Sequence, residues 1–131
     1  MIKEFVLEGF HHDEYGSLEK SGLFKFITKT YGDTAFGAEE CFIGTTDWSN
    51  GITCNKDKTF FPSSWSKQTT VKVIFEANKN RIEELQSPSI SQRKFLCLGP
   101  DNMLIDVIVD LKDKIISAYP NIKNFLNVKE D

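Results

Sequence analysis

The last third of the chain carries the pattern that most restricts its fold. Apolar and polar residues alternate from Met103 to Asp110, and short apolar runs lie on either side at Lys94–Leu98 and Ile115–Tyr119. Side chains of a strand point alternately to the two faces of a sheet, so this alternation is typical of a half-buried strand. The connections Gly99–Asn102 and Lys112–Lys114 have the composition of tight turns. We therefore predict a three-stranded antiparallel meander here.

The middle of the chain predicts a hairpin followed by a helix. Strands are expected at Ala38–Ile43 and Gly51–Phe61, with a turn-like connection between them. Pro62 ends the second strand, and a helix is expected from about Lys67 to Lys79. Either Ser63 or Ser64 is a candidate cap for this helix. One face of the helix is expected to lie in the core, and it carries Val71, Ile74, Phe75 and Asn78.

Three further segments complete the prediction. Arg81–Leu85 is a candidate extension of the helix, and Ser87–Ser91 is expected to be a loop. Residues 18–31 fit either a short helix or a strand, because their apolar positions are partly bunched and partly alternating. Ile108, like Phe75, is expected in the core. Together the segments indicate one α+β domain over residues 1–131, built from twisted antiparallel sheets with one or two packed helices.

Composition excludes several classes of protein. A chain of 131 residues with 40% hydrophobic and 27% charged residues is neither disordered nor collagen-like. No apolar run approaches the roughly 20 residues of a membrane span, and we expect no signal peptide in this chain. Of the three cysteines, none forms a Cys-x-x-Cys pair, so we expect buried thiols and no structural zinc. A Cys41–Cys54 disulfide stays open for a secreted protein.

The charge is distributed unevenly along the chain. The net charge is −3, which argues against a general nucleic-acid coat protein. Residues 41–100, however, hold eight Lys or Arg and five Asp or Glu, a net charge of +3. This basic middle segment permits one focused site for an anion, and the acidic segments on either side of it are equally suited to a basic partner.

Three short segments hold residues that suit chemistry on RNA. In Gly9-Phe-His-His12, an imidazole has a pKa near the working pH of a general base, although two ordinary histidines at a strand end would look the same. Lys56 and Lys58 precede the predicted helix and suit a phosphate, although solvated lysines are common there. Ser117 and Tyr119 share one face of a strand, where a hydroxyl and a phenol can read and stack on a base.

The order of these segments resembles the bacterial EndoU-type nuclease domain, which occurs as the C-terminal toxin of contact-dependent inhibition and other polymorphic toxin systems. Gly-Phe-His-His comes first, Lys-Thr-Phe-Phe-Pro-x-x-Trp-Ser leads into the helix, and Leu-Lys-Asp-Lys-Ile-Ile-Ser-Ala-Tyr-Pro closes the pattern. The likeness spans about Phe5 to Ile122. It implies an EndoU-like fold and cleavage of RNA, often tRNA, by the ribose 2′-hydroxyl, which leaves a 2′,3′-cyclic phosphate.

The resemblance also implies roles for individual residues and partners. His11 belongs to the catalytic pair, and Lys58, with Lys56 as the alternative, completes the catalytic centre. Ser117 and Tyr119 line the nucleotide pocket. No cofactor and no metal are expected. A toxin of this kind is delivered into the target-cell cytoplasm as part of a larger exported effector and has a cognate immunity protein.

The chain departs from the family pattern at one point. A second catalytic histidine usually precedes the Gly-Phe-His element, and this chain has no histidine before His11. Three explanations compete: a divergent site in which His12, Tyr119 or another group replaces it, a start at Met1 that truncates the parent protein, and a non-catalytic relative. The alternative functions are an EndoU-like module that binds RNA or protein without cleavage, and a small immunity-type protein.

Overall fold

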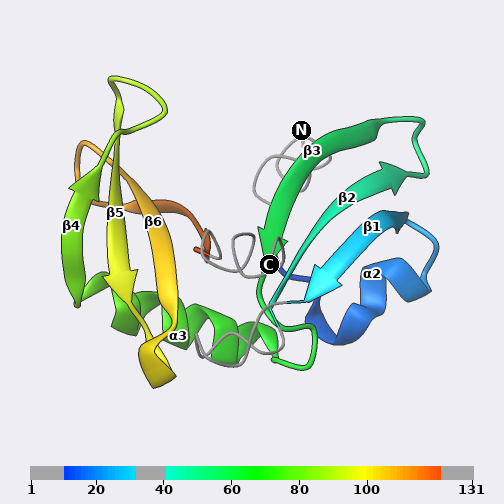
Figure 1. Ribbon diagram of the computed structural model, residues 1–131, viewed down its shortest axis with the longest axis horizontal. Helices are drawn as coiled ribbons and strands as arrows, with labels where there is room; N and C mark the ends of the chain where they lie inside the picture. The colour runs from blue at the N-terminus through cyan, green and yellow to red at the C-terminus, as the bar shows by residue number, and fades with distance from the viewer. Residues whose placement is uncertain (1–10, 32–40, 122–131) are drawn as a thin grey trace, which may run out of the picture.

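Two antiparallel sheets stand side by side, and the two α-helices of the described residues pack against them (Figure 1). The computed structural model describes residues 11–31 and 41–121, without the side chains at positions 30, 31, 55–57 and 101. The three-stranded sheet has the order β1-β2-β3, with the strands β1 Phe24–Tyr31, β2 Phe42–Trp48 and β3 Thr53–Phe60. The four-stranded sheet has the order β4-β5-β6-β7, with the strands β4 Arg81–Leu85, β5 Gln92–Leu98, β6 Leu104–Asp110 and β7 Ile115–Pro120.

The helices are short and lie close to the sheets that they cover. The long one, α3 (Lys67–Asn78), runs along the base of the four-stranded sheet, and α2 (Ser17–Lys20) lies beside β1 (Figure 1). The described residues also form the 3₁₀ turns η1 (Glu14–Gly16) and η3 (Pro100–Asn102). In the described part of the chain, no helix has the length and apolar character needed to cross a membrane.

The α+β class and the C-terminal meander are confirmed. Strands β5, β6 and β7 pair in sequence order, with Leu96 opposite Asp106 and Asp106 opposite Tyr119. The alternation in β6 separates two faces, because Ile105, Val107 and Val109 are fully buried in the main core. The other face carries Asp106 and Ile108, and Ile108 is only half-buried, so its expected place in the core is wrong.

Two cores stabilise the two halves. The main core lies between α3 and the four-stranded sheet and also takes in Cys41 and Phe61 from the other half. The second core is aromatic: Phe42 stacks on Phe60 at 5.0 Å, and Phe24 stacks on Trp48 at the same distance. Because Phe61 directly follows β3, the end of that strand anchors the three-stranded sheet in the main core.

Helix α3 differs from its prediction at three points. Its cap is Ser66, whose hydroxyl accepts a hydrogen bond from the Thr69 N–H at 3.0 Å, and neither Ser63 nor Ser64 has that role. The buried face is made by Thr70, Val73, Ile74 and Ala77. Phe75 lies further round the helix and is 55% exposed, so its expected place in the core is wrong.

Arg81–Leu85 does not extend α3 but forms β4. The helix ends before Asn80, whose amide donates to the Glu76 carbonyl at 3.1 Å and satisfies one carbonyl of the last turn. The backbone then pairs with β5, since the Leu98 N–H donates to the Asn80 carbonyl at 2.9 Å. The guanidinium of Arg81 lies 4.0 Å from the centre of the Phe95 ring. Pairing with β5 thus replaces helix propagation.

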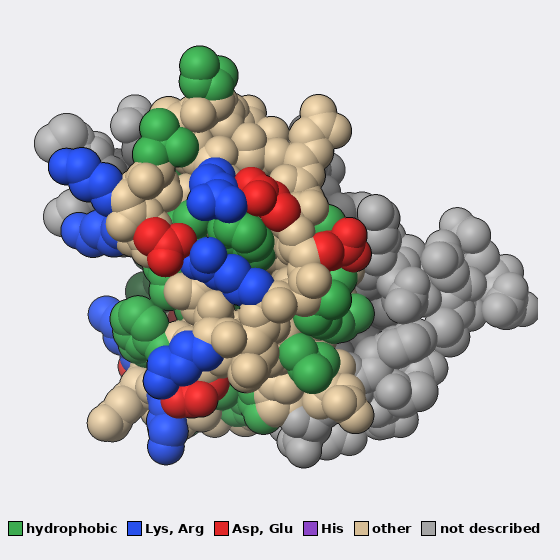
Figure 2. Space-filling model, turned by 90° about the vertical axis from the view of Figure 1, so that its left-hand side faces the viewer, with side chains coloured by type: hydrophobic (Ala, Val, Ile, Leu, Met, Phe, Trp, Pro, Cys, Tyr) green, Lys and Arg blue, Asp and Glu red, His purple; other side chains and the backbone are tan. Residues whose placement is uncertain are grey.

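Charged side chains of both signs lie over hydrophobic ones on the β4 side of the molecule (Figure 2). Arg93 also approaches the Phe95 ring, at 4.9 Å, and pairs with Glu84 at 2.9 Å, whereas Arg81 pairs with Asp113 at 2.8 Å. The arginines therefore shield an aromatic core residue while their charges are balanced.

The remaining segments resolve the open points of the prediction. Residues 17–31 form both alternatives in turn, first α2 and then β1. The strand expected at Ala38–Ile43 begins at Phe42 in the described residues and continues to Trp48, so the turn is shorter than expected and lies at residues 49–52. The Ser87–Ser91 loop is confirmed. All three cysteines are free thiols, with Cys41 and Cys97 buried and Cys54 half-buried.

Candidate functional site

The segment that carries the two histidines is held against the end of β3. The Phe61 N–H donates to the His11 carbonyl at 2.8 Å, and the Tyr15 N–H donates to the Ser63 carbonyl at 2.7 Å. Backbone hydrogen bonds of this kind do not depend on side-chain rotamers. The backbone of the residues that follow β3 therefore fixes where His11 and His12 lie.

The His11 ring is fixed on two sides. Its Nδ1 lies 2.7 Å from the Thr59 carbonyl oxygen, which can only accept, so Nδ1 carries the proton in the neutral ring. The ring lies 4.8 Å from the Tyr119 ring at an angle of 34°, and 6.2 Å from the Phe60 ring. Among the described residues, no group hydrogen-bonds to Nε2. His11 thus has the tautomer in which Nε2 is able to accept a proton.

Burial keeps the His11 ring neutral at pH 7. The pKa of His11 falls from 6.5 to about 4, with burial as the largest cause and the nearby charge of Lys58 acting in the same direction. The hydrogen bond to Thr59 acts in the opposite direction and is outweighed. A neutral imidazole with an unprotonated Nε2 is the protonation state that a general base requires, although a pKa of about 4 lies well below the working pH near which such a base is most effective.

His12 is engaged with the start of α3. Its Nε2 lies 3.0 Å from the Trp65 carbonyl oxygen, and the Thr70 hydroxyl oxygen lies 3.3 Å from the same nitrogen. Burial is the main cause that lowers the pKa of His12, against weaker opposing effects of Trp65, Glu14 and Asp13. His12 is therefore also mainly neutral at pH 7, and its contacts connect the histidine segment to α3.

A cavity of about 610 Å³ connects three of the predicted residues. His11, His12 and Ser117 contribute to its lining. Apolar side chains of α3 and β7 also line it, together with three charged residues: the apolar ones are Val71, Ile74, Ile115 and Ile116, and the charged ones are Asp13, Glu14 and Lys67. The cavity thus combines histidine nitrogens and a hydroxyl with a hydrophobic wall, which is the usual make-up of a small-ligand site.

Of the two lysines predicted for the site, Lys58 and Lys56, the structure describes the side chain of Lys58 only. Lys58 is half-buried on β3, opposite Gly44 of β2, and its charge reaches His11. Gly44 is required there, because a β-carbon would clash with the Thr28 carbonyl oxygen. The side chain of Lys56, the alternative, lies outside the described residues, as does the segment Phe5–Phe10. The structure therefore brings together His11, Lys58, Ser117 and Tyr119, from segments far apart in the chain.

Sequence reasoning missed three polar residues behind Tyr119. Lys94 Nζ lies 3.5 Å from the Asp106 carboxylate and 5.4 Å from the centre of the Tyr119 ring. The Asn121 amide donates to the other Asp106 oxygen at 3.0 Å. A signal was present in the sequence, since Asp106 interrupts an apolar strand. Its partners, however, depend on the register of β5, β6 and β7.

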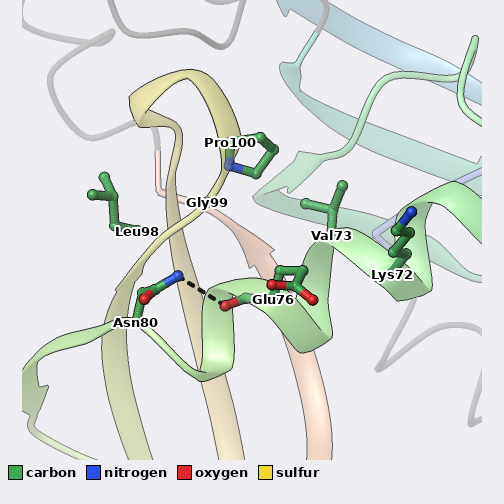
Figure 3. Close-up of a pocket in the computed structure, with 7 residues that line it drawn as sticks. All are labelled: Lys72, Val73, Glu76, Asn80, Leu98, Gly99 and Pro100. Carbon is green, nitrogen blue, oxygen red and sulfur yellow. Dashed lines mark hydrogen bonds between the residues drawn. The ribbon is translucent and has the colours of Figure 1, made fainter.

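A second cavity, of about 490 Å³, lies apart from these residues between α3 and the β5–β6 connection. Figure 3 shows Val73 and Pro100 at its sides, with the Asn80 side chain bonded to the Glu76 carbonyl. Lys72 and Glu76 are its charged residues, and no predicted site residue lines it. Within residues 11–31 and 41–121, no three His, Cys, Asp or Glu side chains are grouped as a metal ion would require.

No protein-family model matches the chain, and neither a curated protein nor a solved structure matches it. The resemblance described above therefore stays a prediction that depends on the motifs alone. The geometry of the candidate site stands independently of it.

Proposed function

We propose that the chain is an EndoU-like endoribonuclease that cleaves RNA without a metal ion. The observation that carries the proposal is the approach of the His11 and Tyr119 rings to 4.8 Å between their centres, together with the charge of Lys58 that acts on His11 and the cavity that His11 and Ser117 both line. These four residues come from the three segments that suit RNA chemistry, and β3 and β7 lie in different sheets. Their proximity in the folded chain supports the proposal.

In this mechanism His11 is the general base. Its Nε2 takes the proton of the ribose 2′-hydroxyl, whose oxygen attacks the adjacent phosphorus while the bond to the 5′-oxygen breaks, and the 5′-oxygen leaves as a hydroxyl after it takes a proton from water. The hydrogen bond from Nδ1 to Thr59 holds the ring in the required tautomer. The charge of Lys58 offsets the negative charge that builds on the phosphorane, which is most effective in a partly buried site.

Ser117 and Tyr119 recognise the nucleotide. The half-buried Tyr119 ring offers a surface on which a base can stack, and Ser117 adds a hydroxyl two residues away on the same strand. A toxin role follows from the resemblance, with tRNA as the substrate and a cognate immunity protein as the partner. The exposed side chains of Val71 and Ile116, 42% and 44% exposed beside the cavity, are compatible with a partner that covers it.

The proposal is tested by incubating the purified chain with total tRNA in EDTA, followed by a denaturing gel and analysis of the 3′ ends. We expect discrete fragments that end in a 2′,3′-cyclic phosphate, and a loss of about 10²–10⁴ in rate for His11→Ala. The cleavage rate of Lys58→Ala is compared with that of Lys72→Ala, which removes a lysine of α3 that lines the other cavity. Intact RNA from folded protein across several RNA pools would contradict the proposal and favour a binding module.

A further inference from the structure

The face of the four-stranded sheet that carries Tyr119 also holds a buried carboxylate. Asp106 is 5% exposed and lies directly opposite Tyr119 in the β6–β7 register. The apolar face of the same strand packs in the main core, so Asp106 belongs to the other face. A buried charge is costly unless it is paired and hydrogen-bonded, so its partners identify what the carboxylate stabilises.

Two partners bind this carboxylate. Asn121 donates to Oδ1 at 3.0 Å, and Lys94 Nζ lies 3.5 Å from Oδ2. The Lys94 side chain is itself only 24% exposed. Both charges of the pair are thus largely removed from water, and the loss of either one leaves the other buried without compensation.

Lys94 also reaches Tyr119. Its Nζ lies 5.4 Å from the centre of the Tyr119 ring, on β7, while Lys94 itself is on β5. Burial acts to lower the pKa of Lys94, but contacts with the Tyr119 hydroxyl and the Asp106 carboxylate outweigh it and raise the pKa. The ammonium group therefore stays charged between these two partners.

Asp106, Lys94, Tyr119 and His11 form an unbroken chain of contacts. We propose that the Lys94–Asp106 pair is a positioning device that holds the Tyr119 ring against His11. The ring covers one side of His11 at 4.8 Å, and Thr59 binds its Nδ1. The catalytic consequence rests on the proposed nuclease function, whereas the positioning itself does not.

Histidine NMR tests the positioning without RNA. The chain has two histidines, so the ring signals of His11 and His12 are readily assigned. If the pair holds Tyr119 in place, Asp106→Asn and Lys94→Met loosen the ring and admit water to His11. We expect the His11 midpoint to rise from about 4 by about one pH unit toward 6.5. The midpoint of His12, which contacts Trp65 instead, is expected to stay constant.

Two further variants complete the test. Glu84→Gln breaks an ion pair of the same sheet whose side chains are 48% exposed, and it is expected to leave the His11 midpoint unchanged. Tyr119→Phe keeps the ring and removes the hydroxyl that Lys94 contacts, so it tests the same contact in a variant of nearly unchanged shape. An upward shift of His11 is expected there too. An unchanged His11 midpoint in Tyr119→Phe and in whichever of the two charge variants folds would overturn the inference.

The RNA assay separates the two proposals. If the parent chain cleaves RNA, Asp106→Asn is expected to lower kcat/KM about 10–100-fold, because misplacing a catalytic group by about 1 Å costs that much, while Glu84→Gln keeps full activity. Failure of the parent chain to cleave any RNA overturns the nuclease proposal alone. A shifted His11 midpoint without any change in kcat/KM would overturn the catalytic part of the inference and leave the structural part.

Discussion

The centres of the His11 and Tyr119 rings lie 4.8 Å apart, although His11 precedes α2 and Tyr119 belongs to β7. His11 is tied to the end of β3, in the three-stranded sheet, and Tyr119 belongs to the four-stranded sheet. The site is therefore formed only where β3 and β7 come into contact. Any change that separates the sheets removes both the stacking and the burial of His11.

The burial of His11 makes stability depend on pH. Its pKa is about 4 in the folded chain and 6.5 in an unfolded one, so between these values the unfolded state binds more protons. The free energy of unfolding is therefore expected to fall as the pH is lowered from 6.5 toward 4, by roughly 3 kcal/mol from this group. Urea unfolding at several pH values measures it.

His11→Gln is the matched control for this pH dependence. A glutamine amide can still donate to the Thr59 carbonyl but does not titrate. Carboxylates contribute equally to both proteins, so the difference between their curves isolates His11. Parallel curves for the parent chain and His11→Gln from pH 7 to pH 4 would contradict the prediction and show that the ring is not desolvated.

The two phenylalanines Phe61 and Phe75 are expected to differ strongly in their contribution to stability. Phe61 is 1% exposed in the main core, and Phe75 is 55% exposed on α3. Removing a buried ring costs about 3–5 kcal/mol, because apolar burial and packing are both lost. We expect a cost of that size for Phe61→Ala and less than about 1 kcal/mol for Phe75→Ala in urea unfolding. Equal costs would mean that Phe75 is buried after all.

Ser66 is expected to matter more for α3 than the serines that precede it. Its hydroxyl accepts the Thr69 N–H, one of the donors left unpaired at a helix start. Ser66→Ala is therefore expected to cost about 1 kcal/mol of stability. Ser63→Ala is the control, since the Ser63 backbone carbonyl accepts from the Tyr15 N–H and an alanine keeps that carbonyl. A larger loss of stability for Ser63→Ala than for Ser66→Ala would contradict the assignment of Ser66 as the cap.

The sequence predicted the strands of the last third well, because their period-two alternation is a local signal. It failed where two local signals compete. The expected helix has apolar residues on more than one side, and only contact with the sheet decides that Val73 and Ile74 face inward while Phe75 faces out. Likewise, Arg81–Leu85 has no strong helix or strand pattern of its own, and pairing with β5 decides its structure.

The candidate site shows the same limit. Motifs indicated His11, Lys58, Ser117 and Tyr119 individually, since each stands in a short and recognisable context. Their proximity to one another depends on how the two sheets dock, which the motifs do not specify. The Lys94–Asp106 pair was missed because it depends on the exact register of β5 and β6, with Leu96 opposite Asp106, and that register follows from the geometry of the connecting turn rather than from the residues of either strand alone.

Tyr119 is expected to set the preference for the cleaved sequence. Its ring is half-buried beside His11 on the strand that also carries Ser117, so a base bound next to the reacting phosphate is within reach of it. Stacking of a base on an aromatic ring is worth roughly 1–3 kcal/mol. Tyr119→Ala is therefore expected to flatten the distribution of cleavage sites, whereas Tyr119→Phe keeps the preference. Sequencing of the fragment ends from a mixed RNA pool gives the distribution. If Tyr119→Ala cut the same sites in the same proportions as the parent chain, base stacking on this ring would be excluded as the source of preference.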